Sequence, residues 1–183
     1  WVLEMFGYMS DIEATDEEDP VGRILILTDE DEDGKMDQSK IFLDSLKLAR
    51  AFCLLDGGIL YAEPPNLWFS KIENDQPLSK TLVDSVYAVG GNVEHQPNTL
   101  LLGLDNWIYS AKSRFRYRKL GDNWVKEETV FRGQWGMSQD DEGRLFYNTN
   151  SNQLRGDFIY PTHFSEEALF TLKRGVNEEI AKD

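Results

Sequence analysis

The chain has 183 residues, enough for one sizeable domain, with 12% aromatic residues, 14 glycines and a mean hydropathy of -0.49. This composition is typical of a folded β-rich domain, and no apolar run approaches the roughly 18 residues that a membrane-spanning helix needs. The net charge of -14 argues against non-specific nucleic-acid binding, which depends on neutralising phosphates.

The negative charge is concentrated near the start of the chain. Residues 1–37 hold 13 acidic residues against two basic ones, Arg23 and Lys35, whereas the remainder is close to balanced. The single cysteine, Cys53, lies among apolar neighbours in "ARAFCLLDGG", which favours a buried, inert thiol and excludes a disulfide framework. The chain starts without an initiator Met or a signal peptide and ends without a stop signal, so we expect an internal piece of a longer protein, truncated at both ends.

The first strong strand signal is "RILILTDEDEDGKMDQSKIFLDSL" at residues 23–46, which predicts a strand, a polar turn and a second strand. The turn has the spacing D-x-D-x-D-G, which lets alternate carboxylates converge on a hard cation while Gly34 permits the sharp turn. It resembles a calcium loop, although Lys40 stands at the twelfth position, where such loops have a bidentate Glu. A solvated hairpin turn is the alternative interpretation. The predicted metal ligands are Asp29, Asp31, Asp33 and Asp37.

Internal repeats organise the rest of the chain. An acidic residue or Gly followed by an apolar-aromatic pair recurs in "DGGILYAEP" at 56, "LDNWIYSA" at 104 and "DDEGRLFYNT" at 140, and each copy predicts a turn leading into a strand. The strand pair at 23–46 is repeated by "NLWFSKIENDQPLSKTLVDSV" at 66, and "SRFRYRKLGDNWVKEETVFRG" is a third pair.

Short strands that recur every 40 to 50 residues predict an all-β fold, a partial β-propeller of about three to four blades. Residues 1–183 would then be part of a single propeller domain. A β-sandwich is the alternative architecture, but β-sandwiches do not contain internally repeated sequence patterns of this kind. The tail "HFSEEALFTLKRGV" is the one segment that suggests a helical or irregular insertion.

One strand in the third pair is strongly basic. "SAKSRFRYRK" alternates basic residues with Phe115 and Tyr117, so the basic side chains should share one strand face. That face would either meet an anionic group, such as a ligand or the acidic start of the chain, or be solvated and paired. The basic residues are Lys112, Arg114, Arg116 and Arg118.

His95 and Arg132 precede successive inner strands of the predicted propeller. The loops that lead into inner strands open toward the central channel, so these two residues from neighbouring blades are expected to meet at the rim of one pocket. A neutral imidazole there would be suited to accept a proton. The alternative is that His95 is an ordinary polar residue at a strand end.

The segment "HQPNTLLLGLDNWIY", from His95 to Tyr109, resembles the H-x-G-G-x-L-x-F-G-x-D-G-x-L-Y pattern of the soluble quinoprotein sugar dehydrogenases. Similarly, "RGQWGMSQDDEGRL", from Arg132 to Leu145, resembles R-N-P-Q-G-L-x-x-x-P-D-G-x-L in that family. Phrases such as "AEPPNLWF", "GGNVEHQPN", "FRGQWG" and "LFYNTNSNQLRGD" are closer still to a bacterial group related to sorbosone dehydrogenases, the membrane-bound dehydrogenases common in planctomycetes and often fused to a c-type cytochrome domain.

This resemblance implies a six-bladed propeller that oxidises a sugar or alcohol, with His95 as the general base and pyrroloquinoline quinone as the cofactor. It also implies an extracytoplasmic or periplasmic location, with a membrane anchor in the full-length protein, and electron transfer to a c-type cytochrome whose haem lies outside this chain. The chain departs from the quinoprotein pattern at Gly133, which replaces Asn, and at Gln96-Pro97. A non-catalytic propeller that binds a glycan, or one that positions a haem domain, is the alternative. The predicted cofactor-binding residues are Arg132, Gln134, Asn150 and Arg155.

Overall fold

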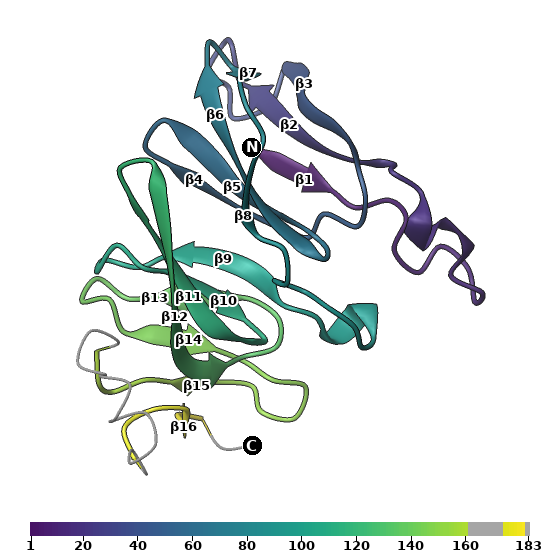
Figure 1. The fold of residues 1–183 in the computed structure, drawn as a ribbon. Coiled ribbons are helices and arrows are strands. Elements are labelled where there is room, and N and C mark those ends of the chain that lie inside the picture. Colours follow the sequence, from purple (N-terminus) through teal and green to yellow (C-terminus); the bar gives the residue numbers. More distant parts are fainter. Residues whose placement is uncertain (161–173, 182–183) are drawn as a thin grey trace. The chain divides into compact units, whose positions relative to one another are not determined.

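The computed structural model describes residues 1–160 and 174–181 (Figure 1). Its regular structure in these residues consists of antiparallel strands and two short 3-10 helices, Thr15–Glu18 and Val93–His95, which confirms the all-β prediction. No helix among the described residues is long and apolar enough to cross a membrane. The predicted helical or irregular insertion falls mostly on residues 161–173, which lie outside the described residues.

The chain divides into two compact units, Trp1–Val89 and Gly90–Asp183, and each contains two antiparallel sheets. In the first unit, one sheet has the order β1-β2-β3, and the other has the order β4-β5-β6-β7 with β8 also paired to β6. Its strands are β1 (Val2–Glu4), β2 (Gly22–Thr28), β3 (Gln38–Leu46), β4 (Ala51–Leu55), β5 (Gly58–Glu63), β6 (Asn66–Glu73), β7 (Gln76–Pro77) and β8 (Thr81–Asp84).

The second unit contains two four-stranded sheets, β12-β11-β10-β9 and β13-β14-β15-β16. In both sheets, each strand pairs with the next one along the chain. The strands are β9 (Asn98–Leu102), β10 (Ile108–Ala111), β11 (Ser113–Leu120), β12 (Asn123–Arg132), β13 (Met137–Gln139), β14 (Leu145–Tyr147), β15 (Arg155–Gly156) and β16 (Glu178–Glu179).

The repeated phrases mark equivalent strands of these sheets. The turn-and-strand phrase forms β5, β10 and β14, each of which pairs on one side with the strand before it and on the other with the strand after it. The paired-strand phrase forms β2 with β3 and β11 with β12. Consecutive up-and-down sheets of three to five strands are what successive propeller blades consist of.

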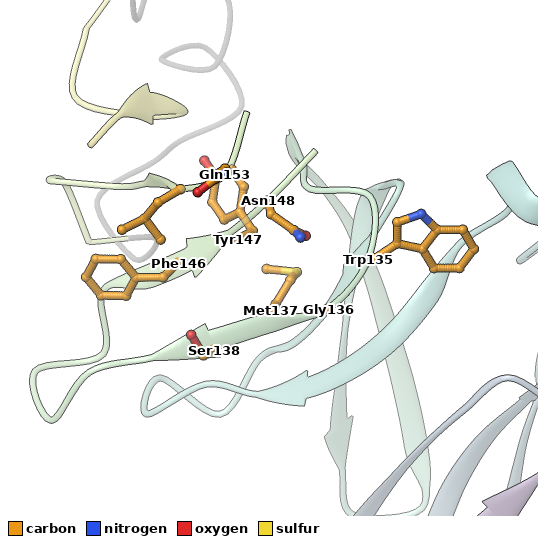
Figure 2. Close-up of a pocket in the computed structure, with 9 residues that line it drawn as sticks. Trp135, Gly136, Met137, Ser138, Phe146, Tyr147, Asn148 and Gln153 are labelled. Atoms are coloured by element: carbon orange, nitrogen blue, oxygen red, sulfur yellow. The ribbon is translucent and has the colours of Figure 1, made fainter. Parts of the chain in front are cut away.

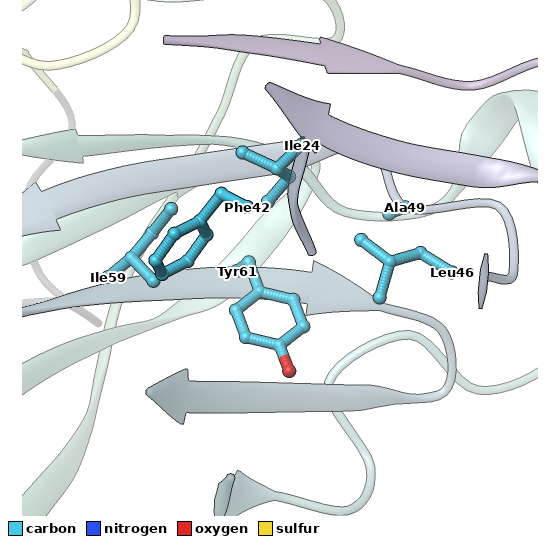
Figure 3. Close-up of a cluster of buried hydrophobic side chains, with 6 residues drawn as sticks. All are labelled: Ile24, Phe42, Leu46, Ala49, Ile59 and Tyr61. Carbon is cyan, nitrogen blue, oxygen red and sulfur yellow. The ribbon is translucent and has the colours of Figure 1, made fainter. Parts of the chain in front are cut away.

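Each unit has a core formed by side chains from both of its sheets. In the first unit, Ile24 and Phe42 pack with Ile59 and Tyr61, and Figure 3 shows these side chains gathered between the strands. In the second unit, Trp107 and Tyr109 pack with Leu145 and Tyr147. The buried residues of the first core are mostly aliphatic and those of the second mostly aromatic. Because burial of apolar area is the main favourable contribution to folding, these clusters hold each pair of sheets together.

The hairpin between β4 and β5 requires a glycine at its second turn position. A Cβ added to Gly58 would overlap the ring of Phe69 and lie 2.6 Å from the carbonyl oxygen of Ser70. The neighbouring Gly57 has a φ of 71° and open space around it. Gly58 is therefore required by the close approach of β6, whereas at Gly57 the left-handed turn favours glycine without excluding Asn.

We expect Gly58→Ala to destabilise the protein by about 1–3 kcal/mol, because the added methyl group forces β5 and β6 apart. Thermal unfolding followed by circular dichroism would measure the loss. Gly57→Asn is the matched control and should have a small effect, since Asn tolerates the left-handed conformation. Equal midpoints for the wild type and Gly58→Ala would contradict this account.

Candidate functional site

The loop that carries His95 lies at one end of the β9–β12 sheet. Asn98, the first residue of β9, is paired with Ala111, the last residue of β10. The backbone N–H of Lys112 then donates to the carbonyl oxygen of Arg132, the last residue of β12, at 2.9 Å. Because β9 starts where β10 and β12 end, the His95 loop lies beside the segment that follows β12.

Asn98 fastens these two segments together. It is buried, with 6% of its surface exposed, and its Nδ2 donates to the carbonyl oxygens of Gln134 at 2.7 Å and Gln96 at 3.2 Å. The next residue, Thr99, has a φ of 56°. A β-branched residue in the left-handed region costs about 1–3 kcal/mol, and such strain persists only where the surrounding contacts impose it.

His95 is exposed and contacts the side chain of Gln134. The Nδ1 atom of His95 lies 3.4 Å from Nε2 of Gln134, whose side chain is buried. The short helix Val93–His95 begins with a cap in which Asn92 Oδ1 accepts the N–H of Glu94 at 2.8 Å. An amide can present either its NH2 group or its oxygen to an imidazole. When the oxygen of Gln134 faces Nδ1, Nδ1 carries the proton and Nε2 can accept one.

Arg132 lies at the same end of the sheet, but its guanidinium points into the interior. It is 1% exposed, and its Nε is 2.6 Å from Oδ2 of Asp157, which follows β15. Its Nη1 donates to Thr129 Oγ1 at 2.9 Å and to the carbonyl oxygen of Val130 at 3.0 Å. Arg132 is therefore part of a buried ion pair, whereas the sequence predicted it at a pocket rim beside His95.

Asp157 accepts two further hydrogen bonds and donates one, and these make the network continuous across the second unit. The hydroxyl of Tyr147 donates to its Oδ1 at 2.6 Å, and the backbone N–H of Asn177 donates to the same oxygen at 3.0 Å. Its own N–H donates to the carbonyl oxygen of Leu145 at 3.0 Å. Burial raises the pKa of Tyr147, and the negative charge of Asp157 raises it further. The phenol therefore stays protonated and remains a donor to the carboxylate.

The other residues predicted to bind a cofactor are Asn150, on the loop after β14, and Arg155, the first residue of β15. Asn150 is exposed. Arg155 donates from Nη1 to the carbonyl oxygen of Asn177 at 2.6 Å and from Nε to Oδ1 of Asn152 at 3.2 Å. Arg155 therefore connects Asn152, in the loop before β15, to Asn177, in the segment before β16. Among the four residues predicted to bind a cofactor, the side chain of Gln134 contacts His95 in the part of the chain that the structure describes.

The acidic loop of the first unit brings together three of its four predicted metal ligands. One carboxylate oxygen from each of Asp29, Asp31 and Asp37 lies within 4.8 Å of the others. Asp33 instead pairs with Lys35, at 3.0 Å between Oδ2 and Nζ. Backbone N–H groups orient the cluster, since that of Gly34 donates to Asp29 at 2.8 Å. The convergence suits a hard cation with oxygen ligands, and calcium binding stays a prediction.

The basic strand face packs on aromatic rings. The guanidinium carbons of Arg116 and Arg118 lie 4.3 and 4.1 Å from the centroid of the Trp107 ring. Arg116 also pairs with Glu127 at 2.9 Å. These contacts favour the interpretation that the basic residues are paired within the unit, because cations over an indole face are already stabilised.

Sequence reasoning missed a pocket on the last sheet of the second unit. It has a volume of about 340 Å³ and lies beside β13, β14 and the loop after β14 (Figure 2). Trp135, which directly follows Gln134, lines it and is 42% exposed. The signal in the sequence was an aromatic residue in the glycine-containing turn "RGQWGM".

The family model named "Domain of unknown function (DUF7133)" matches residues 1–182 of this chain. The chain belongs to the DUF7133 family. No curated protein and no solved structure matches it. What this DUF7133 chain does is therefore inferred from the geometry around His95.

We expect Asp157→Asn to destabilise the protein by about 3–5 kcal/mol, because it leaves the buried guanidinium of Arg132 without its counter-charge. Chemical denaturation would measure the loss. The double variant Arg132→Met, Asp157→Leu should recover much of it, since no unpaired charge is then buried. A single variant as stable as the wild type would contradict the proposed importance of the pair.

We expect about 10 mM Ca²⁺ to stabilise the protein by about 1.4–2.7 kcal/mol if the loop binds with a dissociation constant of about 0.1–1 mM. A thermal shift titration would measure this. Asp31→Asn should remove the shift, whereas Glu13→Gln, an exposed acidic change outside the loop, should preserve it. An equal shift in both variants would indicate general screening of charge and would contradict a site at this loop.

Proposed function

We propose that this chain is the propeller part of a dehydrogenase that oxidises a sugar or alcohol, with His95 as the base toward the substrate hydroxyl. The observation that carries the proposal is the exposed imidazole of His95, with Nδ1 in contact with the buried amide of Gln134. It stands in a segment that resembles the base-containing motif of the quinoprotein sugar dehydrogenases.

Three contacts support this role for His95. The Asn92 cap orders the loop before it, Asn98 holds the backbone of Gln134, and Gln134 meets Nδ1. A base must be held at a fixed position and keep one nitrogen open to the substrate. In the proposed reaction, Nε2 takes the proton from the hydroxyl group. Gln134 is the positioning residue. The contact joins its Nε2 to Nδ1, and with the amide turned so that its oxygen faces Nδ1, it would hold the imidazole proton there and leave Nε2 to accept one.

Oxidation of an alcohol carbon also needs a hydride acceptor, and we propose a quinone for this role because of the motif resemblance. Pyrroloquinoline quinone carries carboxylates that need accessible cationic donors. The two arginines predicted to bind the cofactor do not supply them, because Arg132 is buried against Asp157 and Arg155 is directed at Asn152 and Asn177. We therefore assign no residue of this chain to the quinone.

The proposal includes a c-type cytochrome domain or protein as the electron acceptor and an extracytoplasmic, periplasmic location. Both follow from the resemblance to the sorbosone dehydrogenase-related group.

A second candidate function is non-catalytic binding of a glycan. The internal ion pair of Arg132 favours it, because a guanidinium committed to Asp157 is a structural group rather than a ligand-binding one. His95 and Gln134 would then contribute hydrogen bonds at the surface. The two candidates share a polyhydroxylated ligand and differ in whether it is oxidised.

We expect His95→Ala to lower the turnover of a sugar or alcohol by about 10²–10⁴-fold, because the substrate hydroxyl loses its base. The assay would add pyrroloquinoline quinone and Ca²⁺ to the purified protein and follow reduction of an artificial electron-accepting dye across a panel of sugars and alcohols. The fold should be unaffected, since the side chain is exposed.

Glu94→Gln is the matched control, because it changes a neighbouring side chain in the same short helix and keeps the Asn92 cap, which uses the backbone of Glu94. It should turn over at the rate of the wild type. Equal turnover in His95→Ala and the wild type would remove His95 from the mechanism. No dye reduction by the wild type with any compound would overturn the dehydrogenase and favour the glycan-binding candidate.

A further inference from the structure

The pocket of the second unit has an uncharged lining. Of the described residues that line it, none carries a formal charge at neutral pH. Its one ionisable group is the phenol of Tyr147, which donates to Asp157 at 2.6 Å and keeps its proton because burial raises its pKa. A charged ligand would lose its hydration without gaining a counter-charge here, so the lining selects a neutral one.

Asn148 supplies a hydrogen-bond acceptor that the described protein does not satisfy. Its Oδ1 atom is buried and has no partner among the described residues. Figure 2 draws the side chain of Asn148 among the residues that line the pocket. A buried acceptor without a donor costs about 1–3 kcal/mol, so a ligand that brings a hydroxyl or N–H group to it gains that energy on binding.

The rest of the lining combines an aromatic surface with exposed polar groups. Trp135 is 42% exposed, and Ser138 and Gln153 are exposed as well. Met137 and Phe146 add apolar surface between them. The lining therefore offers aromatic and apolar surface together with hydroxyl and amide groups, a combination that matches a ligand with an apolar C–H face and a rim of hydroxyl groups. The volume of about 340 Å³ lies within the range of small-molecule sites.

We propose that this pocket binds a neutral polyhydroxylated ring, such as a pyranose, with one of its hydroxyl groups donating to Asn148 Oδ1 and its C–H face on Trp135. The site goes beyond the proposed function, because neither His95 nor the predicted cofactor residues line it. It is a binding site, and its occupation requires no oxidation of the ligand.

The test is isothermal titration of the purified protein with D-glucose, D-galactose, D-mannose and myo-inositol, and with D-glucuronate as the charged counterpart. At least one neutral compound should bind with a dissociation constant below about 10 mM. D-Glucuronate should bind at least tenfold more weakly than the neutral compound. Asn148→Leu should weaken binding of that compound at least tenfold and leave the unfolding midpoint unchanged or higher, because the atom removed has no partner in the described protein.

Two further variants keep the result interpretable. Trp135→Ala, at an exposed position that the fold tolerates, should also weaken binding at least tenfold, and Asn123→Leu, an exposed change that does not line the pocket, should not alter it. His95→Ala should bind normally, so loss of turnover in that variant would leave this proposal standing. Absence of binding by every neutral compound, or wild-type affinity in both Asn148→Leu and Trp135→Ala, would overturn it.

Discussion

The buried ion pair between Arg132 and Asp157 is the constraint on which the second unit depends. Arg132 ends β12, and Asp157 follows β15, so the pair connects the two sheets of the unit through charged atoms that are removed from water. Such a pair is tolerated only when its remaining hydrogen-bonding positions are filled. Thr129, Tyr147 and the backbone of Asn177 fill most of them, while Nη2 of Arg132 is buried without a partner among the described residues. These contacts join the ends of several strands in one network.

The network also determines which groups are left for chemistry. A guanidinium held on two sides inside the protein cannot also meet a ligand at the surface without separating from Asp157. At this end of the β9–β12 sheet the imidazole of His95 is exposed instead, and the buried amide of Gln134 contacts it. Asn98 and the strained backbone at Thr99 fix the segment that carries them. The proposed base therefore rests on neutral amide contacts rather than on a cationic partner.

Much of the fold could be predicted from the sequence because its strands follow a repeated phrase. Gly or Asn in the turn and an apolar-aromatic pair after it placed β5, β10 and β14 correctly, since local conformational preference and burial agree at these positions. The predicted convergence of carboxylates in the acidic turn is found for Asp29, Asp31 and Asp37, whereas Asp33 pairs with Lys35. Spacing alone does not show whether a given carboxylate joins the cluster or pairs with a neighbouring lysine.

The site was less predictable because its decisive contacts are not local. Asp157 lies 25 residues beyond Arg132, in "LRGD", and nothing in that phrase distinguishes a buried counter-ion from a surface acid. The pocket depends on the loop after β14 folding back near Trp135, which periodicity does not describe. His95 was easier to locate, because a strand start is a local property and its exposure follows from the loop that precedes it.

Tyr147 belongs at once to the Asp157 network and to the wall of the pocket. A change at this position would disturb the core and the cavity together, whereas Ser138 and Gln153 are exposed at the opening and take no part in that network. Substitutions at Ser138 or Gln153 would therefore alter the opening of the pocket and leave the Asp157 network, and with it the packing of the two sheets, intact.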